Sequence, residues 1–449
     1  MEPVDLVLPE IREIIKDNPK ELALALEDFH EVEIAQIYQR LSEEENKIFV
    51  ASLSIEVLSQ VFLSLEKKER RQIISQLPSG KAAKLIEQLS PDDRADFLQE
   101  LPSEICEALL ATVDRQIVRD IRALMNYPPD SAGGIMTTEF IKVYERLSVD
   151  ECLKMVRRLA VDHELIYTIY VADEESGMLM GVVSLRDLLV SSGDIKISDI
   201  MTTQVITVNY NQEQQEVAEL ISKYDLLAIP VVDHHNRMIG VITIDDILDV
   251  VKEEQSEDIQ RIGALQPIEE SYFDTPFFSL MKKRASWLVM LFFGELLTSN
   301  AMRHFEDSIK ASLALVFFVP LVLSSGGNSG SQSSTLVIRS IVMGEIQNKK
   351  RIVQLLSREL LMGAALGTVL GIVGFFRALI WNYQQPSIAV VVTLTLLFVV
   401  IIGTTVGTGL PLLFKRLGFD PAVSSAPFIA SLVDVLGIVA FFTIAKIIL

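Results

Sequence analysis

Apolar positions recur every twelve residues through the first hundred positions of the chain. A leucine marks each period, and an apolar pair follows it eight and nine residues later; the leucines are Leu41, Leu53, Leu65, Leu77, Leu89 and Leu101. Serine follows three of these leucines, at Ser42, Ser54 and Ser90, where a helix N-cap is expected. Each unit therefore predicts one short helix and a turn. One such unit cannot bury its apolar face alone, so we expect the units to stack into a helical solenoid over residues 1–130.

A duplicated pattern comes next. Residues 135–138 (Ile-Met-Thr-Thr) recur at 200–203, and the strand-like stretch at 181–187 recurs at 240–246. Between these anchors, each copy has the apolar pattern of a strand, a helix and a second strand. The duplication predicts two α/β units, at residues 131–199 and 200–250, followed by a connecting helix at 251–280.

Long apolar stretches fill the rest of the chain, residues 281–449. About twenty apolar residues in a helix cross the hydrocarbon of a bilayer. By this measure we count five spans, at about 285–303, 311–338, 355–378, 388–413 and 423–447. Basic residues cluster before span one, between spans two and three, and between spans four and five, which are on one side if the spans alternate. The positive-inside rule makes that side cytoplasmic, so we expect a multi-pass protein of the cell membrane with a cytoplasmic N-terminal half and its C-terminus outside.

Two polar features interrupt the spans. Asp434 lies about ten residues into span five, and an intramembrane carboxylate usually marks an ion or proton pathway. The structural alternative is a buried ion pair, but no Lys or Arg occupies the middle of a span. Glu295 is the other mid-span acid, and it either shares the pathway or forms a protonated hydrogen-bonding group.

The second feature is the run of small polar residues 324–334 inside span two. Three glycines weaken a continuous helix, and irregular backbone at this depth survives where it lines a cavity. We therefore expect a broken helix whose carbonyl groups, hydroxyl groups and Asn328 side chain face an ion. Close packing of small residues between helices is the alternative, and both can hold together.

Charge is divided unevenly along the chain. Residues 1–284 carry 29 basic and 53 acidic residues (29 − 53 = −24), whereas the rest carries 11 and 7 (11 − 7 = +4), for a total of −20. The acidic half argues against nucleic acid as a partner. The two cysteines form no disulfide framework, which fits a reducing cytosol, and the acidic N-terminus shows no signal peptide.

The connecting helix carries acids on one face, at Asp246, Asp249, Glu253 and Glu257. A solvated acidic face is the ordinary explanation of such a run. Because this helix joins the duplicated α/β units to a membrane domain, we also expect its acids to repel those of a facing surface until a divalent ion bridges them. Asp92, Asp93 and Asp96 of the solenoid offer such a surface.

In this order, the parts resemble the MgtE family of magnesium channels, with a tandem CBS-domain pair. The most specific matches are Pro320 with residues 326–332, residues 131–137, and residues 430–434. The resemblance implies a multi-domain, mainly α protein with an N-terminal helical solenoid, an α/β CBS pair, a connecting "plug" helix and a five-helix transmembrane domain. It also implies a homodimer in the lipid bilayer whose pore holds hydrated Mg²⁺ at Asp434.

The resemblance further implies that cytosolic Mg²⁺ closes this pore. The ion pathway would include Ala430, Gly327, Asn328 and Ser331 beside Asp434. The implied regulatory metal-binding residues are Asp92, Asp96, Gly134, Glu213, Asp225, Asp246, Asp249, Glu254, Glu257 and Asp258. CBS pairs bind adenylates such as ATP in some members, and Ser184, Asp187 and Thr243 (with Asp246) are the positions that would hold the ribose. Gln215 and Ala426 depart from residues that relatives often have, an acid and a polar residue respectively.

Other functions remain open from the residues alone. The chain could carry another divalent cation such as Mn²⁺ or Co²⁺, as a channel or as a coupled carrier, or be a nucleotide-regulated carrier of another solute. A carrier of anions would need a cation or half-helix N-termini at mid-membrane, where this chain has an aspartate. An intramembrane aspartyl protease needs two facing aspartates, so we expect no enzyme. A receptor without transport leaves the polar segment of span two unexplained.

Overall fold

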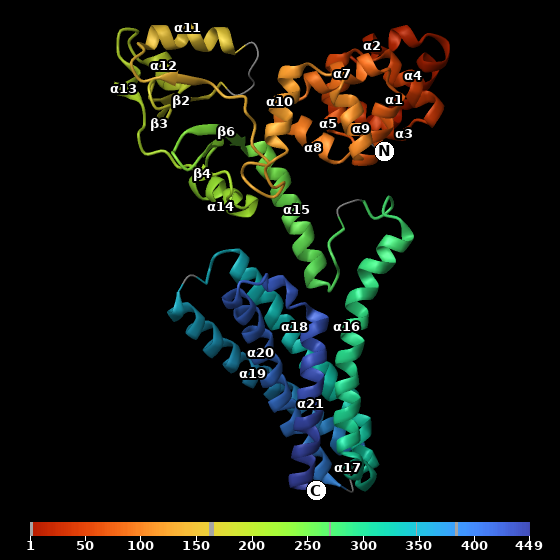
Figure 1. Cartoon of the computed structure of the whole chain (residues 1–449). Helices are drawn as coiled ribbons and strands as arrows, with labels where there is room; N and C mark the ends of the chain where they lie inside the picture. The colour runs from red at the N-terminus through yellow and green to blue at the C-terminus, as the bar shows by residue number, and fades with distance from the viewer. Residues whose placement is uncertain (1–2, 161–165, 269–270, 347, 382–384) are drawn as a thin grey trace. The chain divides into compact units, whose positions relative to one another are not determined.

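The computed structural model describes residues 3–160, 166–268, 271–346, 348–381 and 385–449, and the chain divides into two units, Met1–Glu253 and Glu254–Leu449 (Figure 1). The first unit begins with a series of short helices. Their bounds are α1 Pro3–Asp17, η1 Pro19–Glu21, α2 Leu22–Ala25, α3 Glu31–Arg40, α4 Glu43–Ser52, α5 Ile55–Leu63, α6 Lys67–Gln76, α7 Ser79–Gln88, α8 Pro91–Gln99, α9 Ser103–Leu110 and α10 Arg115–Leu124.

The twelve-residue repeat produces one helix per period, as predicted. The apolar pairs form the solenoid core, where Phe49, Phe62 and Phe97 are fully buried. Ser42 and Ser54 are N-caps that accept hydrogen bonds from the backbone N–H three residues on, at 3.4 and 3.3 Å. These caps give a hydrogen-bond partner to backbone N–H groups that would otherwise lack one at the helix start. They therefore help short helices to begin at a defined residue.

Two matching three-stranded sheets follow the solenoid. The first has the order β1 (Lys142–Tyr144), β2 (Thr168–Ala172), β3 (Leu179–Ser184), and the second has the order β4 (Val208–Asn209), β5 (Ala228–Val232), β6 (Met238–Thr243). In both, the first pair is parallel and the second antiparallel. The accompanying helices are α11 Val149–Leu159, α12 Leu185–Val190, α13 Ile197–Ile200 and α14 Gln214–Tyr224. The duplication therefore predicted the α/β pair correctly.

The repeated Met-Thr segments join the two copies to each other. Thr137 pairs with Val241 of the second sheet, and Thr202 pairs with Val182 of the first. A methyl group built on Gly240 would lie 2.8 Å from Met136 Cγ, so glycine is needed where this segment crosses the strand. Each Met-Thr segment is thus tied to the sheet of the other copy.

The connecting helix differs from its expected extent. It begins directly after β6 and ends earlier than residue 280, as α15 Ile244–Ile262. The end has a local cause: Ala264 has a left-handed φ of 58°, and the Leu265 N–H donates to Gln260 O at 2.9 Å. This turn stops the helix, and residues 269 and 270 of the expected segment lie outside the described residues.

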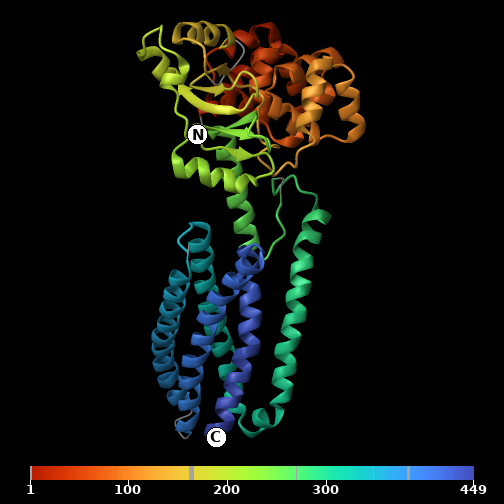
Figure 2. The same cartoon turned by 60° about the vertical axis from the view of Figure 1, so that its left-hand side comes forward.

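Within the described part of the second unit, five helices are long and apolar enough to cross a membrane, which confirms the five predicted spans. They are α16 Phe277–His304, Leu313–Val342 (η2 Leu313–Phe318 with α18 Val319–Val342), α19 Lys349–Trp381, α20 Pro386–Leu417 and α21 Ala426–Ile448; α17 Glu306–Ala311 and η3 Pro421–Val423 are short connections. Helix α20 packs against α18, α19 and α21, whereas α16 packs mainly against α21 (Figures 1 and 2).

The expectation of a broken helix at residues 324–334 is wrong. Helix α18 runs without interruption from Val319 to Val342. Its glycines serve close packing instead: a methyl group on Gly330 would lie 3.0 Å from Gly403 O of α20 and 2.9 Å from Ile429 Cγ2 of α21. Glycine is required there because the backbones of neighbouring helices touch, which is the alternative raised by the sequence.

Candidate functional site

Asp434 lies on α21 beside the glycine-rich face of α18. A methyl group built on Gly327 would lie 3.3 Å from Ala430 Cβ and 3.8 Å from Asp434 Oδ1. Asp434 is half-buried, and no ion pair joins it to a lysine or arginine among the residues that the structure describes. The structure thus brings Gly327, Ala430 and Asp434 together around an intramembrane carboxylate.

The other two expected pathway residues are less directly linked to Asp434. Ser331 donates its hydroxyl hydrogen to Ala426 O at 3.2 Å, which ties α18 to the start of α21. Asn328 is exposed, and its amide donates to Ser324 Oγ at 3.2 Å within α18 itself. Ser331 therefore holds the two helices together, and Asn328 is left accessible one residue from Gly327.

Two further acids belong to the membrane helices. Glu295 of α16 is near enough to Asp434 to repel it electrostatically. Glu359 of α19 accepts a hydrogen bond of 2.7 Å from Ser333 of α18, and sequence reasoning missed it. Glu359 precedes Gly363, Gly367 and Gly371 at four-residue spacing, but those glycines face α20 whereas Glu359 meets α18, so the sequence pattern did not indicate its partner.

In the first unit, Asp92 of α8 lies near Asp246 at the start of α15. Both belong to one group of acids, the Asp92 cluster, which we define as Asp92, Asp96 and Asp246. Burial, followed by repulsion from Asp92, raises the pKa of Asp246 to about 7. Burial also raises the pKa of Asp92, whose Oδ1 atom is buried without a hydrogen-bond partner. A buried carboxylate with an unpaired oxygen, close enough to a second carboxylate to repel it, is the kind of arrangement that a cation would stabilise.

Asp96 has the most exposed side chain of the three acids. Displacement of water by nearby protein atoms, and then the charges of Asp92, Asp93 and Glu100, raise its pKa to about 7, yet its side chain keeps access to solvent. The case for cation binding at this cluster therefore depends on Asp92 and Asp246.

The remaining candidates of the first unit do not gather at one point. Glu213 and Asp225 lie at opposite ends of α14, as its N-cap and C-cap, and both are exposed. Gly134 is buried in a closed turn in which its N–H donates to Ser131 O at 2.8 Å. Asp249 is exposed and pairs with Lys252 at 2.7 Å.

A second acidic group lies in the second unit, and we call Glu254, Glu257, Asp258 and Asp420 the Asp420 cluster. Burial, and then the charges of Asp420 and Glu254, raise the pKa of Asp258 to about 6. Arg261 pairs with Asp420 and, at 2.6 Å, with Glu257. Asp420 was not foreseen, because it follows α20 by sequence and meets α15 only in the folded chain.

The two predicted nucleotide positions have local hydrogen-bonding roles. Ser184 Oγ donates to Asp187 Oδ2 and Thr243 Oγ1 donates to Asp246 Oδ2, both at 2.5 Å. Each pair stands where a strand turns into a helix, and Ser184 is the N-cap of α12. Asp246, the partner of Thr243, belongs to the Asp92 cluster. Asp187 is exposed and is not a member of that cluster.

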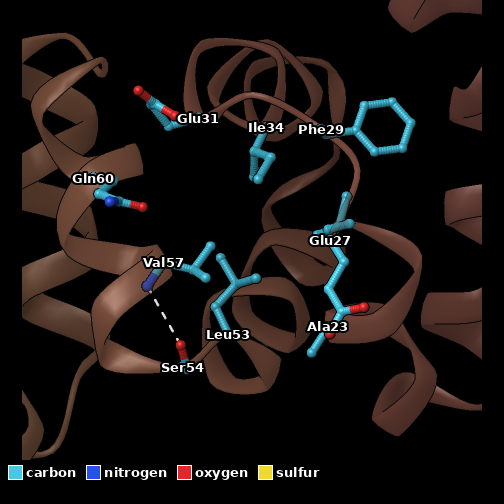
Figure 3. A pocket seen from close by; sticks show the side chains of 10 residues that line it. Ala23, Glu27, Phe29, Glu31, Ile34, Leu53, Ser54, Val57 and Gln60 are labelled. Atoms are coloured by element: carbon cyan, nitrogen blue, oxygen red, sulfur yellow. Dashed lines mark hydrogen bonds between the residues drawn. The ribbon is translucent and has the colours of Figure 1, made fainter.

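Among the described residues, no three or more His, Cys, Asp or Glu side chains are arranged as ligands of one metal ion. A cavity of about 200 Å³ opens in the solenoid, lined by apolar side chains such as Leu26 and Val57 with Glu27 and Glu31 among them (Figure 3). None of the acids in the two acidic clusters is among the residues that line this cavity.

Comparison with known proteins assigns the parts. Residues 319–444 match the family model for a divalent cation transporter, MgtE; residues 29–130 match the MgtE intracellular N domain; and residues 132–193 and 197–253 each match a CBS domain. The chain is 38% identical to the magnesium transporter MgtE of Thermus thermophilus over 339 residues, which cover 75% of this chain and 74% of that one. Identity to the magnesium transporter MgtE of Bacillus subtilis is 37% over 336 residues, 75% of this chain and 73% of the relative.

Two solved structures resemble the N-terminal part. One is the soluble part of a magnesium transporter, with a TM-score of 0.53 and 30% identity over 56% of this chain and 99% of that one. The other is the cytosolic domain of the Mg²⁺ channel MgtE in complex with ATP, with a TM-score of 0.52 and 34% identity over 54% of this chain and 99% of that one. The relatives that align with about three quarters of this chain are named magnesium transporters, which confirms the expectation that the chain is not an enzyme. The solenoid, the CBS pair and the five membrane helices together show that this chain belongs to the MgtE family of divalent cation transporters.

Proposed function

We propose that the chain conducts Mg²⁺ across the cell membrane along a pathway that contains Asp434. The observation that carries this proposal is a lone carboxylate on α21 beside the close-packed Gly327 and Ala430. A charge at this depth is costly unless it serves an ion. Mg²⁺ dehydrates reluctantly and is usually held by one or two carboxylates and waters, which a single aspartate from each of two chains would supply.

A homodimer in the bilayer is part of the proposal. The apolar surface of α16 supports it, because large side chains such as Phe292 and Phe293 are each 63% exposed and need lipid or another chain to cover them. The basic residues near the spans support a cytoplasmic N-terminal half and an external C-terminus, by the positive-inside rule.

Cytosolic Mg²⁺ closes the pore in this proposal. The Asp92 cluster and the Asp420 cluster support it, because each holds carboxylates that repel one another until a cation neutralises them. Gly134, Glu213, Asp225 and Asp249 would complete regulatory sites in a closed or dimeric arrangement. Binding to the closed state alone would then shift the population toward closure.

An adenylate in the CBS pair is a further part of the proposal. The ATP complex of a related cytosolic domain supports it. The Ser184–Asp187 pair is the better position for a ribose, since Asp187 is exposed while Asp246 lies among other acids.

Ion flux into liposomes that contain the purified protein tests conduction. Asp434→Ala should abolish Mg²⁺ flux, whereas Glu295→Gln on the neighbouring helix should retain part of it. Undiminished flux in Asp434→Ala would remove Asp434 from the pathway. Competition by Mn²⁺ or Co²⁺ in the same assay decides the alternative that the chain carries another divalent cation.

A further inference from the structure

Arg261 is the basic residue placed inside the Asp420 cluster. It lies in the last turn of α15, and its two terminal nitrogens bond different acids: Nη1 to Asp420 Oδ2, and Nη2 to Glu257 Oε2 at 2.6 Å. The Arg261 side chain is 36% exposed, and those of Glu257 and Asp420 are 38% and 30% exposed. The guanidinium group thus bridges α15 and the connection after α20 at a half-exposed position.

Both oxygens of the Asp420 carboxylate accept a hydrogen bond in this arrangement. Its Oδ1 atom accepts the Ala422 N–H at 2.8 Å, which caps η3, and its Oδ2 atom accepts Arg261. A cation that binds Asp420 through Oδ2 would lie beside the positive guanidinium group, and repulsion between the two charges favours displacement of that group. Oδ1 can stay in place, because its hydrogen bond lies within the backbone turn.

We propose that Arg261 is a tethered cation that occupies Asp420 and Glu257 when Mg²⁺ is absent, so that regulatory Mg²⁺ competes with it for the Asp420 cluster. This inference rests on the proposed regulation by Mg²⁺. The cluster holds four acids and one arginine, a net charge of −3 with Arg261 (4 − 1 = 3) and −4 without it. Competition of this kind weakens Mg²⁺ binding and raises the concentration at which the pore responds.

The alternative role for Arg261 is purely structural, and the two roles predict opposite shifts. If Arg261 only fastens α15, its loss should loosen the helix and raise the Mg²⁺ concentration needed for closure. If Arg261 competes with Mg²⁺, its loss should lower that concentration, even though the metal-free helix becomes looser.

Limited proteolysis of the full-length protein in detergent measures both effects. A glutamyl endopeptidase cuts after Glu253, Glu254 and Glu257, and its rate is followed in EDTA and across a Mg²⁺ titration. We expect Arg261→Gln to be cut faster in EDTA but half-protected at roughly tenfold lower Mg²⁺ than the wild type, the effect of one unit charge near a divalent ion in a half-exposed setting. Arg261→Lys, which keeps the charge, should stay close to the wild type.

Arg237→Gln is the matched control, since Arg237 also pairs with an acid four residues earlier, Asp233, but lies in the first unit. It should leave the Mg²⁺ dependence unchanged. Asp420→Asn should raise the Mg²⁺ requirement, because it removes the acid for which both cations compete. An unchanged or higher requirement in Arg261→Gln would overturn the inference while leaving Mg²⁺ regulation intact. Absence of Mg²⁺-dependent protection in the wild type would overturn both.

Discussion

Asp246 offers a direct test of the electrostatic strain in the first unit. Its carboxylate accepts the Thr243 hydroxyl at 2.5 Å, and burial and Asp92 raise its pKa to about 7. Because ionisation is disfavoured in the folded unit, the stability contributed by this group is present below the ordinary carboxyl pKa of about 4, declines as the pH rises from 4 to 7, and is lost above 7. Asp246→Asn should therefore stabilise the metal-free first unit at pH 8.

The size of the expected stabilisation follows from the pKa of Asp246. A carboxyl pKa of about 7 in place of about 4 corresponds to about 4 kcal/mol. Asp246 is only half-buried, and solvent screens its charge, so we expect about 1–2 kcal/mol. Added Mg²⁺ should reduce the stability difference between Asp246→Asn and the wild type, because it stabilises the wild type alone.

Hydrogen exchange of the full-length protein, read on peptides that cover α8, measures this stability locally. Both Trp287 and Trp381 lie outside the first unit, so intrinsic tryptophan fluorescence would not report on it. Asp249→Asn is the matched control, three residues further along α15 and exposed in its pair with Lys252. Equal protection in Asp246→Asn and the wild type at pH 8, or an equal gain in Asp249→Asn, would refute the reasoning.

Two predictions concern the membrane helices, with thermal unfolding in detergent as the measurement. Gly403→Ala places a methyl group against Gly326 O, so it should cost about 1–3 kcal/mol through overpacking, whereas Gly409→Ala, on the same helix with open space around it, should not. A similar loss in both variants would argue against close packing of α18 and α20. Ser333→Ala removes the hydroxyl that donates to the Glu359 carboxyl and should cost about 1–3 kcal/mol. An unchanged melting temperature would mean that this hydrogen bond adds nothing to the bundle.

Patterns within single elements were readable from the sequence. The twelve-residue repeat specified the solenoid because helix length, cap and buried face all recur inside one period, as Ser54 and Phe62 illustrate. The five spans and the duplicated sheets were readable for the same reason. Each depends on local periodicity rather than on which elements meet.

Contacts between distant segments were not readable. The glycines of α18 fit a broken helix or a packed one equally well until α20 was known to approach them. Asp420 and Arg261 are 159 positions apart, and no periodicity links them. Whether Glu213 and Asp225 share an ion was not readable either: they cap opposite ends of the 11-residue helix α14 and lie about 18 Å apart along its axis.

The central claim, that the chain conducts Mg²⁺ and is closed by the same ion, is tested most directly by flux with Mg²⁺ controlled on both sides of a membrane patch. We expect that current through the wild-type protein falls as Mg²⁺ rises on the face that bears the acidic half. The double variant Asp92→Asn, Asp246→Asn should resist this closure and still conduct. Current that is indifferent to Mg²⁺ on that face in the wild type, or closure that survives unchanged in the double variant, would contradict the account.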